Sequence, residues 1–154
     1  GDRIAAEIGR SCVHADYRNQ RIVELLWRGL AHYYRDNSIE RIFGCASFHG
    51  TDPEALALPL SYLYHYHLAP PELRVRALSE LHVPMDRIAK EDISARGAIR
   101  QVPALLRAYL RLGGVCGDGA VIDHQFGTTD VFMVLAMENL PDKYHDYFER
   151  DSTG

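Results

Sequence analysis

Residues 20–35 read QRIVELLWRGLAHYYR, and this stretch decides the fold. Apolar residues recur in it at intervals of three and four, which predicts an amphipathic helix from Gln20 to Arg35. Its apolar side consists of Ile22, Leu25, Leu26, Gly29, Leu30, Tyr33 and Tyr34. The flanking segments Ala5–Val13 and Ile39–Ala46 are rich in strand-forming residues. A strand, a helix and a strand joined by short links predict a parallel crossover unit.

The remaining elements follow from helix-start signals and apolar runs. Thr51-Asp52-Pro53-Glu54 is a helix start, so we expect a helix from there to about His67. Residues 72–97 have weak periodicity and predict an irregular excursion. A further helix is expected over Pro103–Leu112 and a buried strand over Val131–Met137. The pattern predicts an α/β chain with one domain over residues 1–150 and a disordered tail over 151–154.

Composition and charge exclude several classes of protein. The 154 residues are 47% hydrophobic and carry a net charge of −4, which is typical of a globular domain. This balance gives no global basic field for nucleic acid. Three widely spaced cysteines without a CxxC motif argue against a disulfide framework or a cysteine zinc site and favour a reducing cytoplasm. We expect no metal site, because His65 and His67 diverge by about 200° on a helix.

Residues 13–26 read VHADYRNQRIVELL and resemble the acyl-donor motif of the Gcn5-related N-acyltransferases, with Arg18 at its basic position. Backbone amides at the start of a helix form an anion site that suits the phosphate of a pantetheine carrier. Arg21 and Val23 replace the glycines of the motif, which favours a donor with one phosphodiester over coenzyme A. The predicted donor contacts are Ser11, Val13, Arg18, Arg21 and Ile22.

A second resemblance begins at residues 7–13, EIGRSCV, which are similar to the E-x-x-R strand of acyl-homoserine lactone synthases. Further blocks resemble, in the same order, the bacterial ornithine-lipid N-acyltransferases, once labelled hemolysin-like proteins. These blocks are Leu26–Leu30, Phe43–Phe48, Leu58–Leu63, Leu68–Pro71, Arg107–Gly114, Gly117–Asp123 and Thr128–Val131. The likeness runs from Glu7 to about Phe148.

This resemblance implies a fold, a reaction and two partners. It implies the C-terminal part of the Gcn5-related N-acyltransferase fold, a mixed sheet with flanking helices, in a domain that lacks the family's N-terminal strands and helices. The implied reaction moves a 3-hydroxyacyl group from acyl carrier protein to the α-amine of L-ornithine and forms lyso-ornithine lipid. No tightly bound cofactor is expected, since the acyl-phosphopantetheine of acyl carrier protein is the donor substrate.

Amide formation from a thioester needs a base for the amine, and Glu7 is the best candidate. Arg10 is the second catalytic candidate, and it shares the site of Glu7 only if Gly9 forms a bulge. A surface position for Glu7, or a salt bridge between Glu7 and Arg10, is the alternative interpretation. Ser47, Tyr62, Asp123 and Asp130 are candidate substrate contacts. Each aspartate, with Asp118, could equally serve a polar turn, and core packing could explain most of the tyrosines.

Other groups are interpreted as structural or as docking residues. We expect Cys12 and Cys45 to be small buried hydrophobic residues rather than nucleophiles. Ser47 has no G-x-S-x-G context, so an acyl-enzyme is not indicated. The arginine pairs at positions 96 and 100, and 107 and 111, complement the acidic surface of acyl carrier protein, although a solvated face is the default interpretation.

Two alternatives to this function remain open: an acyltransferase that uses acyl-coenzyme A on another amine, and an inactive acyl-carrier-binding fragment. The expected location is the cytoplasm, with peripheral, transient contact at the inner membrane surface as a further option. We also predict that the two strands flanking the helix at residues 20–35 diverge at their carboxyl ends to admit the pantetheine arm.

Overall fold

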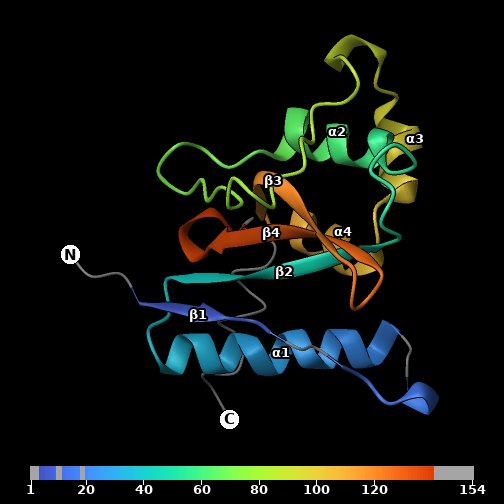
Figure 1. Ribbon diagram of the computed structural model, residues 1–154. Coiled ribbons are helices and arrows are strands. Elements are labelled where there is room, and N and C mark those ends of the chain that lie inside the picture. The colour runs from blue at the N-terminus through green and yellow to red at the C-terminus, as the bar shows by residue number, and fades with distance from the viewer. Residues whose placement is uncertain (1–3, 10–11, 18–19, 141–154) are drawn as a thin grey trace.

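The computed structural model describes residues 4–9, 12–17 and 20–140, and its elements are labelled in Figure 1. Arg10, Ser11, Arg18 and the side chain of Arg21 lie outside the described residues, as does the predicted tail at 151–154. The predictions for these residues therefore stay predictions.

A four-stranded mixed sheet forms the centre of the fold (Figure 1). Its order is β1 (Ala5–Glu7), β2 (Arg41–His49), β4 (Thr128–Ala136) and β3 (Val115–Asp123). Strands β1 and β2 are parallel and are joined by α1 (Gln20–Asp36), whereas β2–β4 and β4–β3 are antiparallel. The predicted crossover unit and the α/β class with flanking helices are confirmed.

The other helices follow the sequence signals only in part. Helix α2 (Ala57–His67) begins after the predicted start, because residues 53–56 form a turn in which the Glu54 amide donates to Asp52 Oδ1 at 2.9 Å. The excursion contains a 3-10 turn (Lys90–Asp92) and the beginning of α3 (Ala95–Gln101). Helix α4 (Ala104–Arg111) is separate from α3, as Pro103 predicts, and short 3-10 turns lie at Ala15–Tyr17 and Met137–Asn139.

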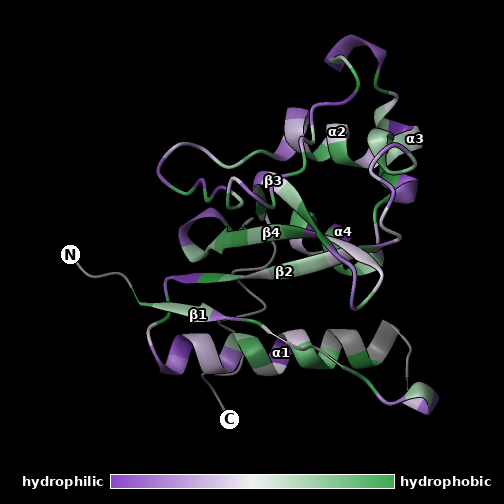
Figure 2. Ribbon diagram, in the orientation of Figure 1, coloured by the Kyte–Doolittle hydropathy of each residue, from purple (hydrophilic) through white to green (hydrophobic). Residues whose placement is uncertain are grey.

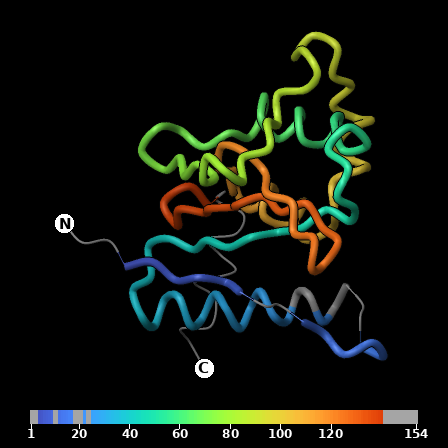
Figure 3. Tube along the Cα trace, viewed as in Figure 1, coloured from blue at the N-terminus to red at the C-terminus, as the bar shows by residue number. Residues whose placement is uncertain are grey.

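The sequence does not predict strand β3 (Val115–Asp123), because its aspartates and glycines favour polar turns. It contains Gly117 and Gly119, which lower strand propensity. Their role is to admit the chain from residue 68 to 83, which pairs with β3 through the bridges Leu68–Cys116, Arg76–Asp118 and Val83–Ala120 (Figure 3). A Cβ at Gly117 would lie 2.7 Å from the Val75 carbonyl oxygen, so the excursion covers the outer edge of the sheet closely.

One face of the sheet is closed by helices. It presents the buried side chains of Ile42, Ala46, Phe48, Val131, Met133 and Leu135. Helices α1, α2 and α4 pack on this closed face through residues such as Tyr34, Leu60 and Leu106. Figure 2 shows the apolar character of β4, the strand at the centre of this packing.

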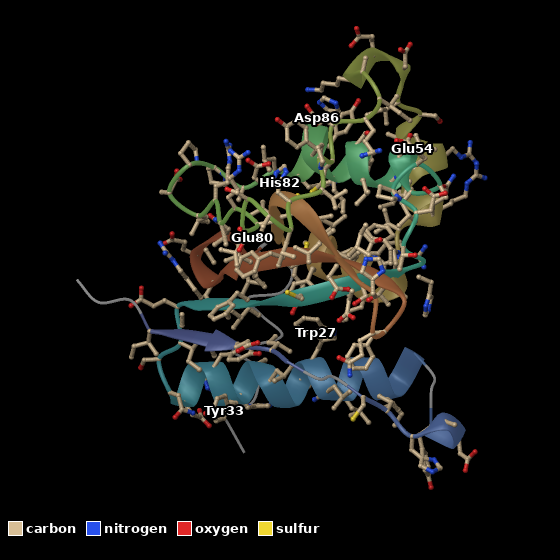
Figure 4. The ribbon with its side chains drawn as sticks, in the orientation of Figure 1. Trp27, Tyr33, Glu54, Glu80, His82 and Asp86 are labelled. Atoms are coloured by element: carbon tan, nitrogen blue, oxygen red, sulfur yellow. The ribbon has the colours of Figure 1, made fainter. Side chains whose placement is uncertain are left out.

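The buried stripe of α1 differs from the predicted one. Trp27, Leu30, Ala31 and Tyr34 face the sheet, whereas Leu25, Leu26 and Tyr33 are about half exposed. Figure 4 shows Trp27 on the sheet side of the helix and Tyr33 away from it. The periodicity is right, but the stripe is rotated because the Trp27 ring packs edge-on against Tyr109 of α4, with ring centroids 5.5 Å apart.

The opposite face of the sheet is covered at one end and open at the other. Ala69, which follows α2, and Leu73 of the excursion pack there against Phe43, Phe132, Val134 and Ala136. Towards the carboxyl end of β2, Cys45, Ser47 and His49 are exposed on this same face. We call this exposed region, with the residues of β1 and β4 beside it, the open face.

Strand β1 leaves the sheet early. Its register with β2 ends at the pair Glu7–Phe43, after which only the Ile8 amide bonds the Phe43 carbonyl, at 2.7 Å. Strand β2 continues to His49 beside β4. Among the described residues, β1 and β2 are thus paired from Ala5 to Glu7 of β1, and the predicted cleft between their carboxyl ends stays a prediction.

Gly44 allows the end of β1 to pass close to β2 at the point where β1 leaves the sheet. A Cβ at position 44 would collide with the Ile8 carbonyl oxygen, which is backbone and cannot rotate away. We expect Gly44→Ala to lower the free energy of unfolding by about 1–3 kcal/mol, because the end of β1 must shift. Urea denaturation measures the effect.

Gly29 provides the matched control. A Cβ there meets nothing within 4 Å, and the residue lies inside α1. Gly29→Ala should therefore stabilise the protein by roughly 0.5–1 kcal/mol. Equal stability of the Gly44→Ala variant and the unmodified protein would contradict the close approach of β1 to β2.

Candidate functional site

Glu7 lies where β1 leaves the sheet. Its register partner is Phe43 of β2, and partners in neighbouring strands point to the same side of the sheet. Glu7 therefore projects on the open face, as the odd-numbered residues of β2 do. The Glu7 Oε1 atom is 3.5 Å from the position that a Cβ would take at Gly9, which shows that the carboxylate folds back over the Gly9 backbone. The side chain is exposed, so this carboxylate can reach a ligand on the open face.

Cys45 lies between two carboxylates on this face. Partial burial raises the pKa of its thiol, and the negative charges of Asp130 and then Glu7 raise it further. Both carboxylates therefore act on the same sulfur atom from two different strands. The raised pKa keeps the group a neutral thiol at pH 7, which makes it a poor nucleophile.

The expected burial of two cysteines was wrong. Cys12 and Cys45 are exposed, and only Cys116 is buried. For Cys45 the alternation along β2 could have revealed this, because Ile42, Gly44, Ala46 and Phe48 occupy the closed face.

Ser47 and Asp130 are register partners on neighbouring strands. Directly opposed residues in an antiparallel pair point to the same side, so the hydroxyl and the carboxylate are adjacent on the open face. The Thr128 hydroxyl donates to Asp130 Oδ1 at 2.9 Å and fixes its orientation. Thr128 was not predicted as a site residue, because only the register reveals its place.

The described acidic residues of the open face are Glu7 and Asp130. Among the described residues, neither Glu7 nor Asp130 has an ion-pair partner within 4 Å. Two carboxylates next to a neutral thiol and a hydroxyl form a site that attracts cations and can accept a proton from one of them.

Two other predicted substrate contacts have local partners. Asp123 Oδ1 accepts a hydrogen bond from the Phe126 amide at 2.9 Å, which fixes the turn between β3 and β4. Tyr62 of α2 bonds its hydroxyl to His67 Nε2 at 3.1 Å and packs on the Tyr66 ring. The described contacts of both residues are therefore away from Glu7 and Asp130, and their roles towards substrate stay predictions.

The sequence places Asp118 and Asp130 in polar turns, but both lie inside strands. Asp118 lies within β3, where it contacts Arg76 at 3.8 Å and His82 at 3.4 Å. Asp130 lies inside β4. His65 bonds the Ile88 carbonyl whereas His67 bonds Tyr62, so these two histidines have separate partners.

The donor side of the predicted site lies at the beginning of α1. In Figure 1 the amino-terminal end of α1 and the carboxyl end of β2 lie on the same side of the molecule, and β1 points towards that side. Val13 and Ile22 are partly buried there. Together with the early end of β1, this arrangement is compatible with a phosphate-bearing arm that reaches the open face from the helix terminus.

In the part of the chain that the structure describes, no group of three or more His, Cys, Asp or Glu side chains is placed to bind a metal ion. No described helix is both long and apolar enough to cross a membrane.

Comparisons with known proteins agree with the predicted resemblance. Residues 2–28 match the family described as the acetyltransferase (GNAT) domain. The chain is 50% identical over 142 residues to the L-ornithine N(alpha)-acyltransferase of Brucella abortus, which covers 92% of this chain and 50% of that protein. It is 45% identical over 148 residues to the protein of the same name from Rhodobacter capsulatus, covering 96% of this chain and 56% of that protein.

A third relative, from Agrobacterium fabrum, has the same name and is 45% identical over 92% of this chain and 48% of its own length. No solved structure matches the chain significantly. The chain spans about half the length of the curated relatives that it matches. Over that span, the resemblance to the ornithine N-acyltransferases that the sequence indicates is confirmed.

Proposed function

We propose that this chain belongs to an N-acyltransferase that moves a 3-hydroxyacyl group from acyl carrier protein to the α-amine of L-ornithine and forms lyso-ornithine lipid. The observation that carries the proposal is the pair of carboxylates, Glu7 and Asp130, on the open face beside Cys45. Ornithine has two ammonium groups, and a site for it needs one carboxylate to bind a cation and another to remove a proton. The names of the relatives support this acceptor.

In this mechanism Glu7 takes a proton from the α-ammonium group of ornithine, directly or through one water molecule. The free amine then attacks the thioester carbonyl carbon and forms a C–N bond. The tetrahedral intermediate collapses as the C–S bond breaks, and the amide nitrogen loses its second proton. The departing pantetheine sulfur leaves as a thiolate and takes up a proton to become the thiol. Asp130 holds the side-chain ammonium group throughout.

The nature of the donor rests on the sequence at the start of α1. Arg21 and Val23 stand where the donor motif has glycines, which leaves less room for a pyrophosphate and adds a cation. The single phosphodiester of an acyl carrier protein fits this composition better than coenzyme A. We propose the cytoplasm as the location, with transient contact at the inner membrane surface because the product is a lipid.

The test is turnover by the full-length protein, followed by mass spectrometry of the product. The donors to compare are 3-hydroxyacyl-acyl carrier protein and 3-hydroxyacyl-coenzyme A. The acceptors are ornithine and norvaline, which is ornithine without its side-chain amine. We expect the carrier protein thioester and ornithine to be preferred. A preference for the coenzyme A thioester, or equal use of norvaline, would refute the donor or the acceptor, respectively.

Cys45 allows a separate test of direct transfer. Because its thiol stays protonated at pH 7, we expect no acyl-cysteine intermediate. Cys45→Ser should therefore keep kcat within about threefold of the unmodified protein, whereas loss of a true nucleophile costs several orders of magnitude.

Cys12→Ser is the matched control, since it removes another exposed thiol. A large loss of kcat in the Cys45→Ser variant only, with a trapped acyl group on the protein in intact mass, would show that transfer passes through Cys45.

A further inference from the structure

One segment of this acidic chain is basic throughout. Residues 94–114 read SARGAIRQVPALLRAYLRLGG, with four arginines and no aspartate or glutamate, although the whole chain has a net charge of −4. The four are Arg96, Arg100, Arg107 and Arg111. Such a local excess of positive charge contrasts with the two carboxylates, Glu7 and Asp130, of the open face.

The fold directs these arginines away from the core. Arg96 and Arg100 are one turn apart on α3, and Arg107 and Arg111 are one turn apart on α4. Beneath them Ala98, Val102, Leu106 and Tyr109 are buried. Arg96, Arg100 and Arg111 are exposed and Arg107 is half-buried. We call this set of four arginines the α3–α4 surface.

The four arginines of this surface form no ion pair within the described part of the fold. No described carboxylate lies within 4 Å of any of the four guanidinium groups, whereas Arg76 pairs with Asp118 and Arg87 with Glu54. Four arginines without a described carboxylate partner leave their positive charges available to an acidic partner.

The α3–α4 surface is connected to the donor side of the molecule. Helix α4 packs directly on α1 through Trp27 and Tyr109. In Figure 1 helix α3 and the amino-terminal end of α1, where the donor phosphate is proposed to bind, both lie at the right of the view, with α3 above the sheet and α1 below it. Helix α4 is therefore the part of this surface that contacts the helix proposed to bind the donor.

We propose that the α3–α4 surface binds the acidic surface of the acyl carrier protein that delivers the thioester. The inference rests on the proposed function for its donor. Arginine suits this role because its planar group can pair with two carboxylate oxygens at once. An exposed, charged contact of this kind accelerates association and releases its partner readily, as a carrier that must leave after each turnover requires.

The experiment uses the full-length protein and varies the concentration of 3-hydroxyacyl-acyl carrier protein at saturating ornithine. The variants are Arg96→Glu, Arg100→Glu and Arg111→Glu, each made singly. We expect each to raise KM for the carrier protein about tenfold with kcat at saturation unchanged, because the reversed charge repels the carrier and the chemistry is intact. An unchanged kcat also shows that the variant is folded.

Lys90→Glu is the matched control, since it makes the same change in net charge at an exposed position outside the surface. Its KM should equal that of the unmodified protein. The KM of the unmodified protein should also rise steeply with salt, because the Debye length falls from about 10 Å at 0.1 M to about 3 Å at 1 M. In the three variants this dependence should be weaker.

The outcomes separate this inference from the proposed function. If all three variants turn over the carrier protein thioester with the same KM as Lys90→Glu, the α3–α4 surface does not bind the carrier protein. The proposed function is then intact. Turnover of the coenzyme A thioester, with none from the carrier protein thioester, overturns the proposed donor and this inference with it.

Discussion

Replacing Glu7 by Gln in the full-length protein should lower kcat by about 10²–10⁴-fold, which is the usual contribution of a positioned general base. Glutamine keeps the size and the hydrogen-bonding oxygen of the side chain but cannot take the proton of the α-ammonium group. Since a base acts on the amine only during the reaction, KM for the acyl donor should change little. Steady-state kinetics with each substrate varied in turn measure both quantities.

The pH profile identifies the role more sharply than a single rate does. Raising the pH frees the amine without help from the protein, so the deficit of Glu7→Gln should shrink as the pH rises. Glu80→Gln is the control, because Glu80 is an exposed carboxylate of the excursion, outside the strands that carry Glu7 and Asp130 (Figure 4). A normal kcat in the Glu7→Gln variant at every pH would mean that Glu7 is structural.

The second large effect is expected at Asp130. Asp130→Asn removes the charge that we assign to the side-chain ammonium group of ornithine, while the hydrogen bond from Thr128 can be kept. Loss of one charge-assisted contact costs about 1.5–3 kcal/mol, which corresponds to a rise in KM for ornithine of roughly 10- to 150-fold. Turnover of norvaline, which has no side-chain amine, should be unaffected.

Asp86→Asn is the matched control for this experiment, because Asp86 is an exposed aspartate near α2 (Figure 4). If Asp130→Asn raises KM for ornithine and for norvaline equally, the Asp130 carboxylate does not recognise the side-chain ammonium group. Its assignment to that group is then wrong.

Much of the architecture could be predicted because it rests on local patterns. The periodicity of residues 20–35 and the apolar strands on either side of it led directly to the β1–α1–β2 crossover. Strand β3 could not be found this way, because Gly117 and Gly119 serve a contact with residues 68–83 that local propensity does not register. The rotation of the α1 stripe has a similar cause, a packing contact of Trp27 with a helix far along the chain.

The site could be predicted residue by residue but not as an arrangement. Glu7, Ser47 and Asp130 were each singled out from the sequence, but only the register of β1, β2 and β4 places them on one face. The same register exposes Cys45, which was expected to be buried. Strand pairing between segments more than 80 residues apart is set by the whole fold, so spacing alone could not reveal it.

The central claim is that the open face holds the amine acceptor between Glu7 and Asp130. A crystal structure of the full-length protein with ornithine tests it most directly. We expect the α-nitrogen within hydrogen-bonding distance of the Glu7 carboxylate, or one water molecule away, and the side-chain nitrogen against Asp130. Ornithine bound elsewhere, with both carboxylates facing solvent, would contradict it.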